Sequence, residues 1–256
     1  MKNKNVLIIS FYEPQYLYFY KKYIEGKKLN VDYYFYTPKK KLENNIYFQN
    51  IKLAIKYKKI FSFFFYYFLK IIFLNLFSSK YRKLKKNIFT KFYSKKIEDF
   101  SNCKRFSNIN EINVSNKDTL IVFGFKYIDK LFFERFKYRY NVHLGELPNY
   151  AGLKSFERSI IDNKNPCITI NEITSRIDMG KILFKKKVNY QYHMNPFEIY
   201  IKMFHESFEI VCQIIDKELK FIYKSYSIHN DSKNNYSFFG FEFNELKVIK
   251  FLKKFN

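Results

Sequence analysis

The feature that most constrains the fold is a continuous apolar run at Thr119–Phe125, near the middle of the chain. Such a run, without polar alternation, is typical of a central parallel strand that is buried on both faces. Ile128–Phe136 then fits a crossover helix, and Tyr138–His143 fits the next strand. The second strand of this pair therefore delivers Asn141 and His143 to its carboxyl end.

The amino-terminal residues predict the same architecture. Val6–Ser10 is a short apolar run, Tyr16–Lys28 places apolar side chains at helical spacing, and Val31–Tyr36 alternates and is rich in β-forming residues. This β-α-β order opens a doubly wound sheet, so we predict an α/β fold with a mostly parallel, Rossmann-like sheet. No Gly-x-Gly-x-x-Gly motif follows the first strand, so the sequence does not support a dinucleotide site.

A second polar loop lies further along the chain. Two strands, predicted at Cys167–Ile173 and Lys181–Val188, flank a loop that contains Asp178. Ligands of open α/β sheets bind beyond the carboxyl ends of strands. Asn141, His143 and Asp178 all fall at such positions, so we expect them to meet at one site.

We predict two parts in the chain. Residues 1–188 should form the α/β domain, with a basic and aromatic insertion at about 50–97. Asn195-Pro196 opens a helix whose apolar stripe continues to about Leu219. Residues 189–256 are therefore expected to form a small helical and irregular carboxyl-terminal extension.

Glycine is scarce in this chain, and its placement marks the two polar loops. Only six glycines are present, and Gly145, Gly152 and Gly180 lie beside the Asn-x-His and Asp segments. A chain this poor in glycine is expected to use it where the backbone needs a positive φ or a close approach. We therefore expect two shaped loops that hold an amide, an imidazole and a carboxylate at the strand ends.

The ordered motif resembles the folate-dependent formyltransferase family, which includes methionyl-tRNA, glycinamide ribonucleotide and sugar N-formyltransferases. That family carries Asn-x-His, a turn ending in Leu-Pro, a glycine at the start of a helix and, some thirty-five residues later, an Asp in a (Val/Ile)-Asp-x-Gly turn. The resemblance covers about Leu120–Leu183. The matching residues are Asn141, His143, Leu147-Pro148, Gly152 and Ile177-Asp178-Met-Gly180.

The resemblance implies N-formylation with 10-formyltetrahydrofolate as the formyl donor. Formyl transfer to an amine passes through a tetrahedral oxyanion, which needs a hydrogen-bond donor, a proton shuttle and a group that orients the shuttle. By resemblance these catalytic roles fall on Asn141, His143 and Asp178, with the partition of proton transfer left open. The resemblance also assigns folate binding to Phe123, Gly124, Phe125 and Leu147, and we expect acceptor binding by Glu146 and Tyr150.

Two loops depart from the commonest family pattern. The usual His-Pro-Ser-Leu-Leu-Pro reads His143-Leu-Gly-Glu-Leu-Pro148 here, and the Asp turn carries Arg176 where the family usually has acidic residues. Each residue taken alone also has a structural explanation. His143 could be a buried structural histidine, Asp178 a turn residue and Asn141 a loop cap. Phe123–Phe125 could be core strand and Glu146 a solvated loop residue. The joint pattern favours a functional site whose charge around the acceptor has changed.

The net charge of +24 is distributed unevenly. No acidic residue occurs between Asn44 and Ile97, and such a block prefers phospholipid, nucleic acid or a phosphorylated substrate. We expect residues 52–96 to contact an anionic membrane surface, and we favour nucleic acid less. The cations of this block are Lys52, Lys56, Lys58, Lys59, Lys70, Lys80, Arg82, Lys83, Lys85, Lys86, Lys91, Lys95 and Lys96.

Within this block, Ile60–Phe77 is nearly long enough and apolar enough to cross a bilayer, which takes about 20 residues. Lys70 and Asn75 interrupt the run, and a central lysine costs about 2.5–3.5 kcal/mol on insertion scales. Three interpretations stay open: a buried core helix with basic flanks, an interfacial helix and a true membrane span.

The cysteines and the amino-terminal sequence indicate the cellular compartment of the protein. Cys103, Cys167 and Cys212 have no metal-ligand spacing, and the first residues lack a secretory apolar segment. These features predict reduced thiols in a cytoplasmic protein that is peripheral at the inner membrane face if the basic block binds lipid. No His, Cys and Asp spacing supports a metal site.

We expect the acceptor to be a small amine, an amino sugar on a nucleotide or lipid phosphate, used for surface polysaccharide synthesis. A phosphate-bearing carrier suits the basic and aromatic block. Two alternatives stay open: a methionyl-tRNA formyltransferase, which the net charge also fits, and a non-catalytic membrane-associated relative whose site persists as a binding pocket. The oligomeric state, including a homodimer, is left open.

Overall fold

A computed structural model describes residues 5–25, 30–37, 51–52, 54–56, 58–73, 76–93, 103–124, 128–190, 194–216 and 243–255. Its centre is a seven-stranded sheet in the order β3-β2-β1-β4-β5-β6-β7. Neighbouring strands from β3 to β5 are parallel, and β6 runs antiparallel to β5 and β7. The predicted α/β fold with a mostly parallel sheet is confirmed. The strands are β1 (Val6–Phe11), β2 (Val31–Tyr36), β3 (Lys104–Phe106), β4 (Thr119–Phe123), β5 (Tyr138–His143), β6 (Cys167–Glu172) and β7 (Ile182–Lys187).

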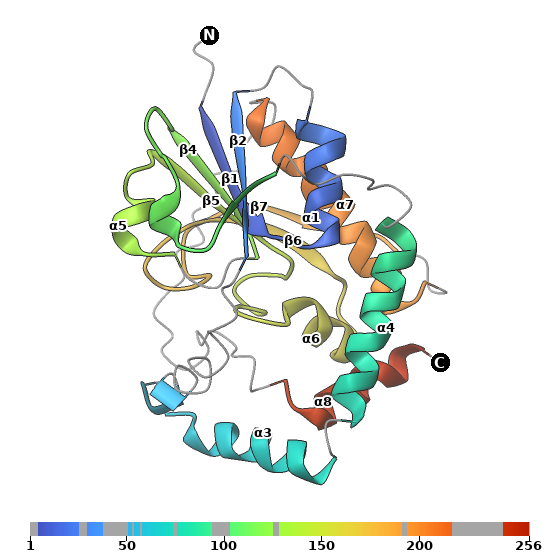
Figure 1. The fold of residues 1–256 in the computed structure, drawn as a ribbon. Helices are drawn as coiled ribbons and strands as arrows, with labels where there is room; N and C mark the ends of the chain where they lie inside the picture. Colours follow the sequence, from blue (N-terminus) through green and yellow to red (C-terminus); the bar gives the residue numbers. More distant parts are fainter. Residues whose placement is uncertain are drawn as a thin grey trace.

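Helices cover both faces of the sheet (Figure 1). Leu120 and Val122 of β4 share a cluster with Phe132 of α5 on one face. Ile121 and Phe123 join the larger cluster with α1, α4, α7 and α8 on the other face. Burial on both faces explains the continuous apolar run in β4. The α-helices are α1 (Pro14–Phe19), α3 (Ile60–Ile72), α4 (Leu76–Tyr93), α5 (Lys130–Phe133), α6 (Ser155–Ile161), α7 (Pro196–Ile215) and α8 (Glu245–Leu252).

The chain after residue 188 continues the core of the sheet domain. Asn195 and Glu198 form a capping box at the start of α7, and Pro196 occupies the first helical turn. Phe204 and Phe208 of α7 and Phe251 of α8 belong to the same buried cluster as the strands. These helices therefore help to build the core, and the boundary at residue 188 stays a prediction.

Several elements differ from their predicted bounds. The helix expected at Tyr16–Lys28 begins at Pro14, a residue that suits a first helical turn, and continues as the π-helix Tyr20–Ile24. The crossover helix expected at Ile128–Phe136 has only the single turn of α5. β3, which has only three residues, and α8 were not predicted.

The Ile60–Phe77 segment forms parts of two helices. α3 and α4 meet at an angle of 87° across residues 73–75, and α3 buries only Phe63 and Leu69. The core-helix interpretation is therefore wrong for α3. In the described part of the chain, no single helix is long and apolar enough to cross a membrane, although the bent α3–α4 pair meets the criteria of length and composition together.

Candidate active site

Asn141 and His143 lie at the carboxyl end of β5. Side chains two positions apart on a strand point to the same face, so the Asn-x-His spacing places the amide beside the imidazole. The antiparallel partner β6 puts Asn171 opposite Asn141 and Thr169 opposite His143. Thr169 Oγ1 donates to the carbonyl oxygen of Gly145 at 2.6 Å, which fixes the start of the loop after β5.

The loop that carries Asp178 connects β6 to β7. Asp178 has a left-handed backbone with a φ of 57°, a conformation that aspartate adopts more readily than most residues. Gly180 lies so close to β6 that a Cβ at this position would overlap the backbone carbonyl of Glu172. The turn therefore requires glycine at 180, which explains the Asp-x-Gly pattern in this chain.

The Asp178 carboxylate is the centre of the site. Its Oδ1 accepts a hydrogen bond from Nδ2 of Asn141 at 2.9 Å, and its Oδ2 accepts one from the backbone N–H of Gly152 at 2.6 Å. Oδ2 also lies 3.5 Å from Nδ1 of His143. Asp178 and His143 are both buried. The structure therefore brings together the three residues that the sequence assigns to catalysis.

His143 is positioned through both ring nitrogens. Nε2 lies 2.7 Å from the carbonyl oxygen of Tyr150, so we assign a hydrogen to this nitrogen as the donor. Nδ1 faces Asp178. Gly145 leaves room for the ring, since a Cβ there would lie 2.8 Å from Nε2 of His143 and 2.5 Å from Cβ of Ser155. An imidazole fixed in this way is suited to holding or passing a proton.

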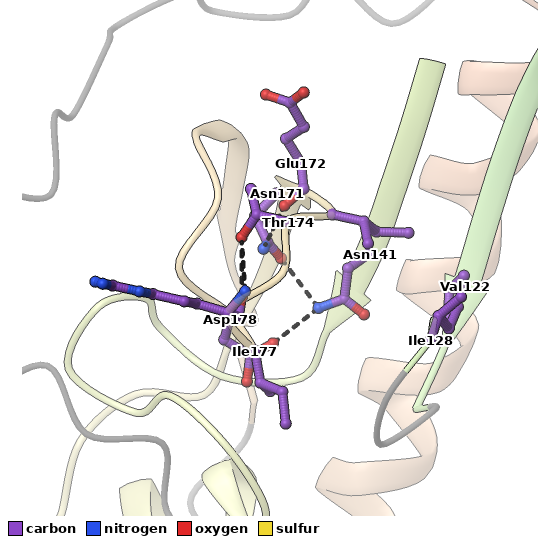
Figure 2. A pocket seen from close by; sticks show the side chains of 10 residues that line it. Val122, Ile128, Asn141, Asn171, Glu172, Thr174, Ile177 and Asp178 are labelled. Atoms are coloured by element: carbon purple, nitrogen blue, oxygen red, sulfur yellow. Dashed lines mark hydrogen bonds between the residues drawn. The ribbon is translucent and has the colours of Figure 1, made fainter. Parts of the chain in front are cut away.

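Both amide hydrogens of Asn141 are used within the protein. Its Nδ2 donates to Oδ1 of Asn171 at 3.1 Å and to Oδ1 of Asp178 at 2.9 Å (Figure 2). Asn141 therefore donates to a bound ligand only when the ligand replaces one of these two acceptors.

A pocket opens beside this cluster (Figure 2). One wall is made by Val122 and Ile128, and the opposite wall by the Asp178 loop. Asn141 and Asp178 lie at its inner end, so a ligand between the walls would meet both an apolar surface and the polar cluster. The complete lining is Val122, Ile128, Asn141, Asn171, Glu172, Ile173, Thr174, Arg176, Ile177 and Asp178.

The described residues among those predicted to bind folate do not line this pocket. Phe123 is buried in the core, where its ring packs against Phe19 and Phe208, and Leu147 is fully buried. Neither residue lines the pocket. Gly124 is exposed at the end of β4, and Phe125 lies outside the described residues. The side chains of Phe123 and Leu147 therefore pack the scaffold instead of contacting a ligand in this pocket.

Tyr150 and Glu146, the predicted acceptor residues, also lie outside the pocket lining. Tyr150 donates from its hydroxyl to Oδ2 of Asp162 at 3.1 Å. Burial and then the charge of Asp162 raise the pKa of Tyr150 to about 12. Its backbone carbonyl is the part that serves the site, through His143. Glu146 is half-buried, and its charge contributes to the raised pKa of Cys167 after the larger effect of burial.

Sequence reasoning missed several lining residues. Asn171 could have been found from strand pairing, because a hairpin formed by the two predicted strands places polar side chains opposite Asn141. Ile177 lies next to Asp178 in the motif and contributes to the apolar wall. Ile128 gave no signal, because an isoleucine after an apolar strand is expected simply to pack in the core.

Comparison with family models gave no match for this chain, and comparison with curated protein sequences gave none. Solved structures do match its fold. A 4-N formyltransferase from Francisella tularensis aligns with a TM-score of 0.52 and 15% identity, over 99% of this chain and 88% of its own. A sugar N-formyltransferase from a Shewanella species aligns at 0.50 and 15%, over 98% of this chain and 89% of its own.

The N-formyltransferase from Helicobacter canadensis, solved with folinic acid and dTDP-3-aminofucose, is also similar. It aligns with a TM-score of 0.50 and 13% identity, over 98% of this chain and 80% of its own. The chain therefore has the fold of the formyltransferases. The three residues that converge on the Asp178 carboxylate are among those that carry the resemblance in the sequence, and Asn141 and Asp178 of these line the pocket.

Proposed function

We propose that this protein is an N-formyltransferase that moves a formyl group from 10-formyltetrahydrofolate to the amine of an amino sugar. The proposal rests above all on one observation: Asn141, His143 and Asp178 converge in a formyltransferase fold, and two of them, Asn141 and Asp178, line a pocket there. One comparison structure is described as a sugar N-formyltransferase and another was solved with dTDP-3-aminofucose, and both support the amino sugar as the acceptor.

The pocket has the character expected of a site for the folate's heterocyclic ring. Val122, Ile128 and Ile173 provide apolar surface, while Asn141 and Asp178 provide polar groups at the inner end. Ligand sites typically combine apolar walls with a few fixed polar groups. The folate supplies the activated formyl group. The protein has to orient this group and accept the proton that the amine loses.

The residues of the cluster divide these tasks. The Asn141 amide stabilises negative charge on the formyl oxygen when that oxygen replaces one of its present acceptors, an interaction of the kind that is worth about 10²–10³-fold in rate. His143 takes up the amine proton at Nε2 when its ring hydrogen lies on Nδ1, which faces Asp178, and the bond to the Tyr150 carbonyl is released; it can then return that proton. The carboxylate of Asp178 orients the ring and compensates its charge when the ring is protonated.

Local charge favours a small acceptor over tRNA. Between His143 and Asp178 the sequence contains four cations and five acids, so the site segment is nearly balanced. A site for tRNA is expected to present cations to several phosphates. Arg176 contributes a single cation to the pocket lining, beside the acids Glu172 and Asp178. We therefore propose an amino sugar linked to a nucleotide or a lipid phosphate.

The test is incubation with 10-formyltetrahydrofolate and a panel of acceptors: nucleotide-linked amino sugars, lipid-phosphate-linked amino sugars and initiator methionyl-tRNA. We expect mass spectrometry to show the gain of one formyl group on an amino sugar, with the tRNA unchanged. Formylation of the tRNA alone would reject the proposed acceptor. Tight binding of the folate without formylation of any acceptor would indicate a non-catalytic relative.

A further inference from the structure

Helix α3 presents an apolar face to the solvent. Figure 1 shows it at the edge of the molecule, next to α8 and away from the sheet. Phe61, Phe64 and Ile71 are exposed by 83%, 62% and 72%. Aromatic and aliphatic side chains of this size are seldom exposed together on a protein that has no partner for them. The exposed set in this region is Ile60, Phe61, Phe64, Phe68, Ile71, Ile72 and Leu76.

α3 buries Phe63 and Leu69 against the protein, and it carries a second apolar stripe that faces outward. Phe61, Phe64 and Phe68 are spaced three and four apart, so they form one stripe. Ser62, Tyr66 and Lys70 follow each other at intervals of four on the other side of the helix, and all are less exposed than that stripe. A surface helix normally turns its apolar stripe inward. The outward stripe of α3 therefore indicates an apolar environment outside this chain.

Basic side chains border this stripe on both sides along the chain. The exposed cations are Lys52, Lys56 and Lys58 before α3, and Lys80, Arg82, Lys83 and Lys86 in the first half of α4. No acidic residue occurs between residues 44 and 97. The environment that covers the stripe should therefore be apolar in its interior and negatively charged at its surface.

The geometry favours a helix that lies along a membrane over one that crosses it. At about 1.5 Å per residue, the thirteen residues of α3 extend roughly 20 Å, shorter than the roughly 30 Å apolar core of a bilayer. The bend of 87° turns α4 away from the axis of α3. On α4, Tyr81, Phe89 and Tyr93 are buried against the rest of the protein, so this helix is part of the folded domain.

We propose that α3 docks on an anionic phospholipid surface, with Phe61, Phe64 and Phe68 inserted at the headgroup level and the flanking cations on the phosphates. Interfacial helices of this type bury their apolar face about 5–10 Å into the membrane. A second copy of the chain is the competing occupant, but a symmetric pairing of this face would bring the basic flanks of both copies together, and they would repel.

The absence of tryptophan from this chain provides a clean reporter. Phe64→Trp places the only indole on the proposed lipid-facing stripe. Leu131→Trp is the matched control, because Leu131 is also a highly exposed apolar residue but lies on α5. We expect vesicles containing phosphatidylglycerol to shift the emission of Phe64→Trp to the blue and to leave Leu131→Trp unchanged, with little effect of phosphatidylcholine alone.

A second set of variants tests the charge. Lys80→Gln, Lys83→Gln and Lys86→Gln together should weaken partitioning to phosphatidylglycerol vesicles roughly 100-fold, because each lysine near an anionic surface contributes about 1 kcal/mol to binding. Lys130→Gln, Lys137→Gln and Lys164→Gln, also at exposed positions, should have little effect. Three results would overturn the proposal: no shift of Phe64→Trp, equal shifts of both indoles, or a shift that depends on protein concentration without vesicles.

Discussion

At the scale of single residues, Asp178 links the two loops of the site. Its carboxylate accepts hydrogen bonds from Asn141 of β5 and from the Gly152 backbone before α6, and it faces His143. A substitution of Asp178 therefore alters both the charge of the site and the orientation of the side chains that contact it. We therefore expect the chemistry of the site to depend on this side chain more directly than on the apolar residues of the pocket lining.

We expect Asp178→Asn or His143→Asn to keep the fold and to lower kcat for formyl transfer by at least ~10²-fold, the usual scale for acid–base and oxyanion groups. Circular dichroism checks the fold, and folate binding should persist. Asp162→Asn is the control, because Asp162 contacts the Tyr150 hydroxyl instead of the cluster. Wild-type turnover in either site variant would remove the catalytic assignment.

Gly180→Ala should disrupt the Asp178 loop. The new methyl group would overlap the Glu172 carbonyl, and relieving such an overlap typically costs about 1–3 kcal/mol or more. We expect a lower Tm together with weaker folate binding. Ser175→Ala, at an exposed position in the same loop, should behave like the wild type. A Gly180→Ala protein with unchanged Tm and binding would show that the loop tolerates the side chain.

Tyr150→Phe distinguishes the side chain of Tyr150 from its backbone. The hydroxyl contacts Asp162, whereas the carbonyl that contacts His143 is kept in the variant. We therefore expect kcat and KM for the acceptor to stay unchanged. A large rise in KM with the folate site intact would show that the hydroxyl binds the acceptor, as the sequence interpretation suggested.

The sequence identifies the cluster because spacing on a strand is enough to place Asn141 beside His143, and because Asp-x-Gly marks a tight turn. The walls of the pocket are harder to predict. Phe123 and Leu147 are apolar residues beside the motif, yet they point into the core, and Val122 and Ile128 line the pocket instead. Which apolar side chain meets a ligand depends on the face of the sheet at which the pocket opens.

At the scale of elements, a buried polar group ties α4 to α6. The Tyr81 hydroxyl of α4 donates to the carboxylate of Glu157, and Lys154 contacts the same carboxylate at 3.1 Å. Burial alone raises the pKa of Glu157, but the charges of Lys154 and Lys85 outweigh it and hold the pKa below its ordinary value. This contact therefore joins α4, the helix that follows α3, to α6, the helix that follows the loop after β5.

Glu157→Gln should destabilise the protein by about 1–3 kcal/mol near neutral pH, since it removes the buried carboxylate that pairs with the half-buried Lys154 and Lys85. The Glu157 pKa is lowered on folding, so its contribution is fully present above the ordinary value of about 4.3 and is lost as pH falls through the lowered pKa. The Tm difference between wild type and variant should therefore shrink in acid. A difference independent of pH would contradict this assignment.

Elements with strong local signals were predicted well. β4 is recognised by its apolar run, and α7 by its capping residues and its stripe. The helix break after α3 was not predicted, because Asn75 is the single polar residue between Ile71 and Phe77 and the segment contains no proline or glycine. A tertiary contact holds the first turn of α4 after the break: Glu245 of α8 accepts hydrogen bonds from the backbone and hydroxyl of Ser78.

At the scale of the whole molecule, the order of elements predicts the doubly wound sheet, and the structures of formyltransferases share the fold. Fold alone does not determine the reaction, so the proposed activity rests on the residues at the strand ends. The aromatic stretch Tyr236–Phe243 is a further candidate in the sequence for contact with a nucleotide base or a lipid. These residues lie outside the described part of the chain apart from Phe243, which is buried in the core.

The most direct test of the central claim is a single-turnover experiment with 10-formyltetrahydrofolate labelled in the formyl group. Excess protein is mixed with the labelled folate and a nucleotide-linked amino sugar, and the position of the label is followed over time. We predict that the label moves from the folate to the sugar nitrogen in the wild type and stays on the folate in Asp178→Asn. Label that remains on bound folate in the wild type, with every amino sugar tested, would contradict the account.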